Sequence, residues 1–211
     1  FIAVFQSNFK RLLAYSSLAQ IGYMLLGIGF LNETGVAATI VHLFNHGITK
    51  ATLFMAAGIF VLRAGSTFFD DIKGLGKAMP WTSAAVVIAG LSLIGVPGTA
   101  GFISKWGLVQ AALERGWWFL ALLIVASSLL AVIYVWRVVE VLYLAEPRER
   151  ANPFNPPLMM IVPLWIMALS CIFFGLNTDL TMSAARIAAE GLFAGAPGLD
   201  AAIATGASSG H

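Results

Sequence analysis

Charged residues are scarce in this 211-residue chain, in which only 10% of residues are Asp, Glu, Lys or Arg and 59% are hydrophobic. Soluble domains carry about 25% charged residues, so the composition argues against a soluble enzyme. The 12 basic residues lie mostly in short polar gaps and form no stripe, so nothing indicates a nucleic-acid partner. The single cysteine of the chain, Cys171, excludes an internal disulfide and a CxxC metal site. The sequence therefore predicts an integral membrane protein that has the lipid bilayer as a partner.

Five apolar runs are long enough to cross a membrane, since a helix needs roughly 20 mostly apolar residues to span the hydrocarbon core. Gaps rich in Asn, Gly, Pro and charged residues separate these runs. The runs cover residues 12–31, 36–62, 81–113, 117–144 and 158–176. The predicted fold is therefore all-α, a polytopic membrane helix bundle with about five transmembrane helices.

The run 81–113 is too long for one straight crossing at about 1.5 Å per residue. Gly95, Pro97 and Gly98 lie in its middle, where proline removes a backbone donor and glycine loosens the chain. The run is therefore either a tight helical hairpin or one crossing made of two half-helices around a break. One crossing places seven basic residues on the same side of the membrane: Lys10, Arg11, Arg63, Lys73, Lys77, Arg148 and Arg150. The positive-inside rule favours this second arrangement, one discontinuous helix with the basic side in the cytoplasm.

The two ends of the chain differ in character. Residues 1–5 resemble the end of an apolar helix and lack the features of a signal peptide, so we expect the C-terminal piece of a longer, transporter-like protein. We expect residues 145–157 to form a cytoplasmic loop and residues 158–176 an additional transmembrane helix. The tail 177–211 has one mildly amphipathic stretch, 181–193, which is expected to lie along the membrane surface, and disorder is expected beyond residue 194.

Three basic side chains, His42, His46 and Lys50, follow one another at i, i+4 and i+8 on one helix face. Ionisable groups in mid-membrane are costly, which makes them functional candidates by default. The alternative is that the histidines are hydrogen-bonded core residues and that Lys50 extends to an interface. Lys50 lies roughly 20 Å from the near end of its run, which exceeds the reach of a lysine side chain. The spacing therefore favours a proton relay.

Lys105 follows Pro97 by two helical turns and is a fourth candidate for this relay. A break exposes backbone groups at membrane depth, which is tolerated only where protein or a cavity lines it. The alternative is a kinked helix whose lysine reaches the outer surface. Arg137 and Glu140, spaced i, i+3 near the predicted cytoplasmic end of a helix, indicate either the mouth of a proton path or a simple interfacial ion pair.

The sequence lacks the residues that metal, haem, phosphate-binding or nucleophilic chemistry needs. His42 and His46 have no third partner for zinc, and no second helix carries a histidine pair for haem. No Gly-rich phosphate loop or nucleophile elbow is present. We therefore expect no cofactor, no metal site and no catalytic residue in this chain, and predict proton transfer along water wires instead. Whether the chain belongs to a larger enzyme stays open.

Several motifs, in order, resemble one family. They are Lys10-Arg11-Leu12-Leu13-Ala14-Tyr15-Ser16-Ser17, Gln20-Ile21-Gly22-Tyr23, His42-Leu43-Phe44-Asn45-His46 with Lys50-Ala51, and Gly95-Val96-Pro97 through Gly101-Phe102-Ile103-Ser104-Lys105-Trp106. Over about residues 5–144 the chain resembles the antiporter-like membrane subunits of respiratory complex I, membrane-bound hydrogenases and Mrp-type Na⁺/H⁺ antiporters.

The resemblance implies a full-length protein with two inverted five-helix repeats, each containing a broken helix. Residues 1–144 would hold the second repeat, with its first helix truncated. The resemblance also implies that His42, His46 and Lys50 lie on a hydrophilic axis and that Lys105 is the ionisable residue of the second broken helix. Asn8 departs from the pattern, since an acid is expected there, and the first repeat is absent. The fragment alone is therefore not expected to transport.

Residues 104–106 and 136–141 are most similar to the D subunit of Mrp-type antiporters. The leading hypothesis is a proton-translocating subunit of a multisubunit Na⁺/H⁺ antiporter in the bacterial plasma membrane, with other subunits as partners. The first alternative is the equivalent subunit of an NADH:quinone oxidoreductase or a membrane-bound hydrogenase. The second is a structural membrane scaffold. The exchanged cation and the direction of transport stay open.

Overall fold

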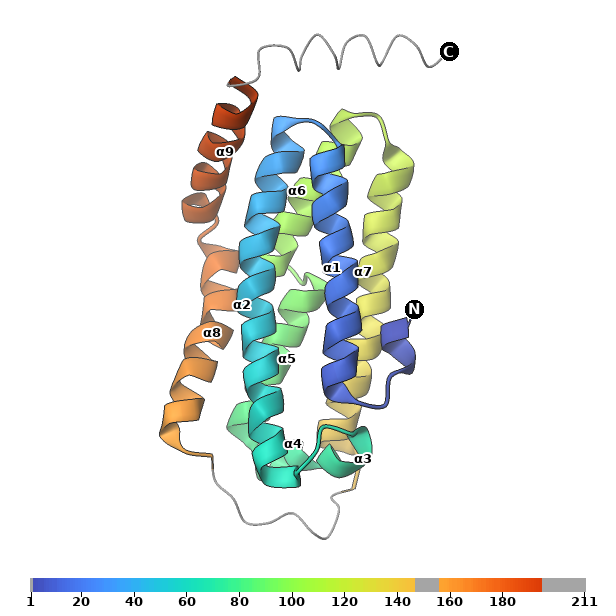
Figure 1. Ribbon diagram of the computed structural model, residues 1–211, viewed down its shortest axis with the longest axis vertical. Helices are drawn as coiled ribbons and strands as arrows, with labels where there is room; N and C mark the ends of the chain where they lie inside the picture. Colours follow the sequence, from blue (N-terminus) through green and yellow to red (C-terminus); the bar gives the residue numbers. More distant parts are fainter. Residues whose placement is uncertain (1, 147–155, 195–211) are drawn as a thin grey trace.

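The computed structural model describes residues 2–146 and 156–194, and almost all of its ordered structure is helical. The long helices run side by side along one axis (Figure 1). In the described part of the chain, extended pairing is limited to one isolated bridge between Asn8 and Phe68. The predicted all-α membrane helix bundle is confirmed.

The first two crossings are α1 (Phe9–Gly29) and α2 (Glu33–Ala64), which run antiparallel (Figure 1). Asparagine side chains start both helices, because Asn8 Oδ1 accepts from the Arg11 amide and Asn32 Oδ1 accepts from the Gly35 amide. Gly65 ends α2 in the left-handed conformation, with φ 74°. Helix α1 covers residues 12–29 of the predicted run 12–31, and α2 covers the whole predicted run 36–62.

The third crossing consists of two half-helices, α5 (Pro80–Ile94) and α6 (Ala100–Glu114), which stack end to end (Figure 1). The linker between the two half-helices contains Gly95 and Gly98, whose φ values are 90° and 87°. Glycine enters this region of backbone conformation without strain. Helix α7 (Trp118–Val139) then returns and ends in a π-helical turn, η2 (Glu140–Leu144). The structure therefore has the predicted single discontinuous crossing and contradicts the helical hairpin.

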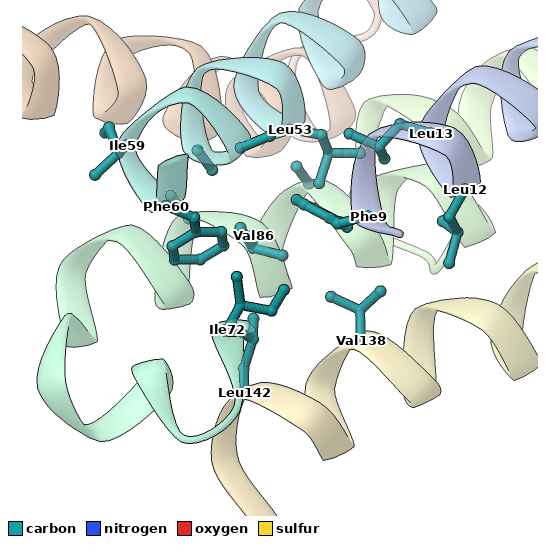
Figure 2. Packing of buried hydrophobic residues seen from close by; sticks show 14 of the residues in the cluster. Phe9, Leu12, Leu13, Leu53, Ile59, Phe60, Ile72, Val86, Val138 and Leu142 are labelled. Carbon is teal, nitrogen blue, oxygen red and sulfur yellow. The ribbon is translucent and has the colours of Figure 1, made fainter. Parts of the chain in front are cut away.

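The predicted loop before this crossing contains two short helices, α3 (Phe69–Ile72) and α4 (Leu75–Ala78). Phe69, Ile72 and Leu75 are buried, so this segment closes the end of the hydrophobic core. Figure 2 shows Ile72 among side chains from α1, α2, α5, α7 and η2. The labelled neighbours are Phe9, Leu12, Leu13, Leu53, Ile59, Phe60, Val86, Val138 and Leu142.

Helix α8 (Leu158–Leu176) matches the predicted additional helix, and α9 (Asp179–Ala194) follows it along the bundle axis (Figure 1). The prediction that the amphipathic stretch lies along the membrane surface is wrong, because Ala185 and Ala189 of α9 are buried against Ala37 and Val41 of α2. Small side chains allow two helices to approach this closely. Residues 147–155 of the predicted cytoplasmic loop, and the tail beyond residue 194, lie outside the described residues.

Among residues 2–146 and 156–194, four helices are long and apolar enough to cross a membrane: α1, α2, α8, and α7 together with η2. The pair α5–α6 makes the fifth crossing. Lys10, Lys73 and Lys77 lie at one end of the bundle and Glu33 and Glu114 at the other (Figure 1). This distribution agrees with the charge asymmetry that favoured one discontinuous helix.

Candidate functional site

Lys50 is buried at the middle of α2, with only 6% of its surface exposed. Its ammonium donates to the Leu13 carbonyl at 2.7 Å and to the Ser16 hydroxyl, both in α1. The alternative in which this side chain extends to an interface is therefore contradicted. α2 carries the lysine and α1 supplies the oxygens that replace water around it.

Lys105 is equally buried, one and a half turns into α6. Its Nζ donates to the carbonyls of Leu93 at 2.9 Å and Ile94 at 2.8 Å. These carbonyls belong to the last turn of α5, where the break leaves them without amide partners and where the helix dipole favours a cation. The side chain therefore ties the two half-helices together and does not reach the outer surface.

The two histidines lie between the lysines. His42 Nδ1 is 2.8 Å from the Ser104 hydroxyl, and the rings of His42 and His46 stack with centroids 6.4 Å apart. His42 Nε2 and His46 Nδ1 are buried and contact no hydrogen-bonding protein group in the described part of the chain. Buried polar atoms of this kind are often satisfied by water.

Tyr23 of α1 connects the two ends of the group. Its ring lies under the ammonium of Lys105, 5.3 Å from the centroid, and meets the His42 ring edge-on at 5.6 Å. Sequence reasoning did not single out Tyr23 as a site residue, although it belongs to a motif shared with the family. The structure thus brings together all four predicted relay residues and adds Tyr23, Ser16 and Ser104.

A cavity of about 240 Å³ lies between α1, α7 and the short 3-10 turn η1 (Ile2–Phe5). Ser16, Gln20 and Tyr23 line it, together with Tyr134 of α7. Ser16 is a partner of Lys50 and Tyr23 is a partner of Lys105, so the cavity touches both ends of the group.

Short polar contacts fix the break beside these residues. Asn45 Nδ2 donates to the Ala100 carbonyl at 2.6 Å, and the Ser92 hydroxyl lies 3.0 Å from that of Thr49. The Gly101 amide donates to the Ser92 hydroxyl at 3.2 Å. A Cβ atom at Gly101 would overlap the Ser92 carbonyl oxygen, so only glycine fits there. Helix α2 therefore holds both half-helices in register.

Arg137 and Glu140 do not form the predicted ion pair. Arg137 Nη1 donates to the Val4 carbonyl at 2.6 Å, and the guanidinium lies 5.1 Å from the centroid of the Phe69 ring. Glu140 begins the π-helical turn η2. Arg137 thus joins α7 to η1 and α3, and a role of either residue at the mouth of a proton path stays a prediction.

Comparison with known proteins assigns the chain to a family. The family described as "NADH:quinone oxidoreductase/Mrp antiporter, TM" matches residues 1–131. NADH-quinone oxidoreductase subunit N of Desulforudis audaxviator is 37% identical, over 86% of this chain and 39% of its own length. F(420)H(2) dehydrogenase subunit L of Methanosarcina mazei is 34% identical, over 84% of this chain and 28% of its own. The chain therefore spans well under half the length of these relatives.

Two solved structures have the same fold. A chain of the Mrp complex from Dietzia sp. superposes with a TM-score of 0.84 at 24% identity, covering 94% of this chain and 45% of that one. A chain of an archaeal membrane-bound sulfane sulfur reductase superposes with a TM-score of 0.76 at 32% identity, covering 82% of this chain and 29% of that one. With its family match and its apolar crossings, the chain is a multi-pass plasma-membrane protein. It belongs to the NADH:quinone oxidoreductase/Mrp antiporter transmembrane family of antiporter-like proteins.

Proposed function

We propose that this chain is part of a proton-translocating membrane subunit in which Lys50, His46, His42 and Lys105 relay protons. One observation carries the proposal: two buried lysines lie at the ends of a pair of stacked imidazoles, and oxygen atoms of the protein hold both ammonium groups. In the described part of the chain these partners are carbonyl and hydroxyl oxygens, so neither ammonium is locked in a carboxylate pair.

The chemistry of the relay follows from the residue types. An imidazole accepts a proton on one ring nitrogen and releases it from the other. The two rings stack with centroids 6.4 Å apart, so their N–H bonds do not point at each other, and the proposal places water between them. At about 30 Å³ per water, the 240 Å³ cavity has room for several waters.

Electrostatic coupling gives the relay its direction. Two positive charges about 6 Å apart repel each other by about 3 kcal/mol at an effective dielectric constant near 20. A proton arriving at one group therefore favours its release from the neighbouring group. A conformational or charge change in a partner subunit would drive transport by shifting this balance.

The energy source that we favour is electron transfer. The relatives at 37% and 34% identity carry the names of an NADH-quinone oxidoreductase subunit and an F(420)H(2) dehydrogenase subunit. On this basis the full-length protein assembles with other subunits of a redox-driven complex. The cation/proton antiporter is the second candidate, supported by the motif likeness of residues 104–106 and 136–141 and by the fold of the Dietzia Mrp chain.

Replacement of the lysines in the full-length protein tests the relay. We expect Lys50→Ala and Lys105→Ala to lower proton translocation at least about tenfold, because a positioned proton carrier contributes that much or more. Lys77→Ala, which changes an exposed lysine of α4, is the matched control and should transport normally. The measurement is dye-reported acidification of membrane vesicles, with assembly of the complex checked by native electrophoresis.

Unchanged transport by assembled Lys50→Ala and Lys105→Ala complexes would leave only the scaffold function. The same vesicles separate the two energy sources. Acidification started by an electron donor and stopped by a quinone-site inhibitor supports the redox complex, whereas a response to added Na⁺ without a donor supports the antiporter.

A further inference from the structure

Helix α8 buries one narrow stripe of its surface. Its buried residues are Leu164, Ala168, Cys171 and Gly175. They follow at i, i+4, i+7 and i+11, so they lie on one face of the helix. The last two of them are small, and small residues let two stretches of backbone approach closely. The C-terminal half of α8 can therefore lie directly against the helix break.

Gly175 contacts the linker that joins α5 to α6. A Cβ atom at this position would lie 2.4 Å from the carbonyl carbon of Thr99 and 2.5 Å from the carbonyl oxygen of Gly98. Both of these atoms belong to the backbone, so no side-chain rotation relieves the overlap. Glycine is the residue that permits such an approach. Helix α8 thus packs on the linker itself and not only on the two half-helices.

One turn earlier, polar contacts join α8 to the break. The Thr49 hydroxyl of α2 lies 3.7 Å from the sulfur of Cys171 and 3.0 Å from the Ser92 hydroxyl of α5. The Ser92 hydroxyl also accepts from the Gly101 amide of α6 at 3.2 Å. Thr49, Ser92 and Cys171 are buried, so bulk water does not compete for these contacts. A single chain of contacts therefore passes through α8, α2, α5 and α6.

The orientation of the Thr49 hydroxyl is specific. Threonine in a helix has two common rotamers, because its hydroxyl can also bond a carbonyl of the preceding turn. Thr52, on the same helix, adopts that alternative and donates to the Ile48 carbonyl at 3.0 Å. The Thr49 hydroxyl points instead to Ser92 and Cys171. A hydroxyl has one proton and two lone pairs, so it can bond both partners at once, and α8 thereby helps to keep it directed at α5.

The α5 turn that Thr49 contacts is also the turn that holds Lys105. The Lys105 ammonium donates to the carbonyls of Leu93 and Ile94, the two residues that follow Ser92. Ser92 has the polar side chain of this turn, so its hydroxyl is the group by which a neighbouring helix can fix the rotation of the turn. If the turn rotates, both carbonyls move away from the ammonium.

We propose that α8 forms a wall of the helix break and that Thr49 and Gly175 are positioning residues for Lys105. Thr49 fixes the rotation of the α5 turn that binds the ammonium, and Gly175 lets α8 hold the linker in place. The family match ends at residue 131, so α8 contributes to the site from outside the matched region. The consequence for proton transfer rests on the proposed relay, whereas the positioning of Lys105 does not.

Chemical labelling of the two buried lysines in the assembled full-length protein tests the positioning. Thr49→Val keeps the shape of the side chain and removes its hydroxyl, whereas Thr49→Ser keeps the hydroxyl. Gly175→Ala pushes α8 off the linker, and Gly47→Ala, in α2, meets no atom within 4 Å and is the matched control. The probe is phenyl isothiocyanate, a membrane-permeant reagent for amines. Mass spectrometry of the digested protein compares labelling of Lys105 with labelling of Lys50.

We expect Thr49→Val and Gly175→Ala to raise the labelling of Lys105 relative to Lys50 at least about fivefold, the lower end of the effect of a lost buried hydrogen bond or an overpacked contact. Lys50 is the internal reference, because its oxygen partners belong to α1. Thr49→Ser and Gly47→Ala should keep the original labelling ratio. Proton translocation should fall at least about fivefold in the first two variants only.

Two results would overturn the proposal. An unchanged labelling ratio in Thr49→Val and Gly175→Ala would mean that the break keeps its shape without α8. An equal rise in the labelling of Lys105 and Lys50 would mean that the whole bundle loosens and that neither residue positions Lys105. A raised ratio with normal proton translocation would support the positioning of Lys105 and contradict the proposed relay, so the two failures are distinguishable.

Discussion

Lys50 and Lys105 bind different oxygen atoms. Lys50 binds a carbonyl and a hydroxyl of α1, whereas Lys105 binds two carbonyls across the helix break. Lys105 also lies over the ring of Tyr23, and a desolvated cation–π contact contributes about 2 kcal/mol. Because the same ring meets His42 edge-on, Tyr23 holds Lys105 and His42 next to each other.

This position of Tyr23 predicts a difference between two substitutions. Tyr23→Leu removes the aromatic face and should lower proton translocation at least about tenfold, since about 2 kcal/mol of cation–π energy is lost. Tyr23→Phe keeps the ring and should retain most of the transport. Vesicle acidification measures both variants, and equal rates for Leu and Phe would mean that the ring does not position Lys105.

The sequence alone was enough to select the four basic residues as candidates for the relay, but not to find the side chains that contact them. Helical spacing places His42, His46 and Lys50 on one face of one helix, and that inference needs no other helix. Ser16, Tyr23 and Ser104 become partners only through the rotation and register of α1 and α6 against α2. A single sequence does not specify these quantities.

The break between α5 and α6 depends on close backbone packing. Gly101 lies against the Ser92 carbonyl while its amide donates to the Ser92 hydroxyl. The whole first turn of α6 is therefore positioned by the last turns of α5. Any side chain at residue 101 must push the two half-helices apart.

Gly101→Ala is therefore expected to destabilise the protein by about 1–3 kcal/mol, the usual cost of overpacking. Gly58→Ala, in the last third of α2, meets no atom within 4 Å and is the control. The thermal midpoint of the purified full-length complex should fall for Gly101→Ala and stay unchanged for Gly58→Ala. An unaltered midpoint for both variants would contradict the packing at the break.

The discontinuous helix was predictable because glycine and proline interrupt an apolar run and because the loop charges choose between the two topologies. The short helices α3 and α4 were not predictable, since four residues are too few to show a helical periodicity. The place of α9 was predicted wrongly. An amphipathic pattern shows that a helix has two kinds of face, but does not say whether the apolar one meets a membrane surface or another helix.

In the whole molecule, α8 and α9 cover opposite halves of α2 and meet beside the break (Figure 1). Ala185 is buried at the contact between α9 and α2, whereas the neighbouring Ala184 is exposed. The two alanines therefore distinguish packing from any general effect of added bulk on the helix.

Ala185→Leu should weaken the docking of α9, since overpacking costs about 1–3 kcal/mol, and Ala184→Leu should not. We expect tryptic cleavage at Arg186 in the solubilised complex to be about tenfold faster for Ala185→Leu, in line with that penalty. Equal cleavage of the two variants would contradict the close contact of α9 with α2.

The lengths of the two half-helices bear on how the protein enters the bilayer during its synthesis. Each has 15 residues and rises by only about 22 Å, whereas the hydrocarbon core is about 30 Å thick. Neither half spans the membrane alone, so the insertion machinery must accept both as one segment, with the exposed backbone of the linker already shielded. Asn45, which binds the carbonyl of Ala100 at the end of the linker, belongs to α2, which the ribosome delivers first.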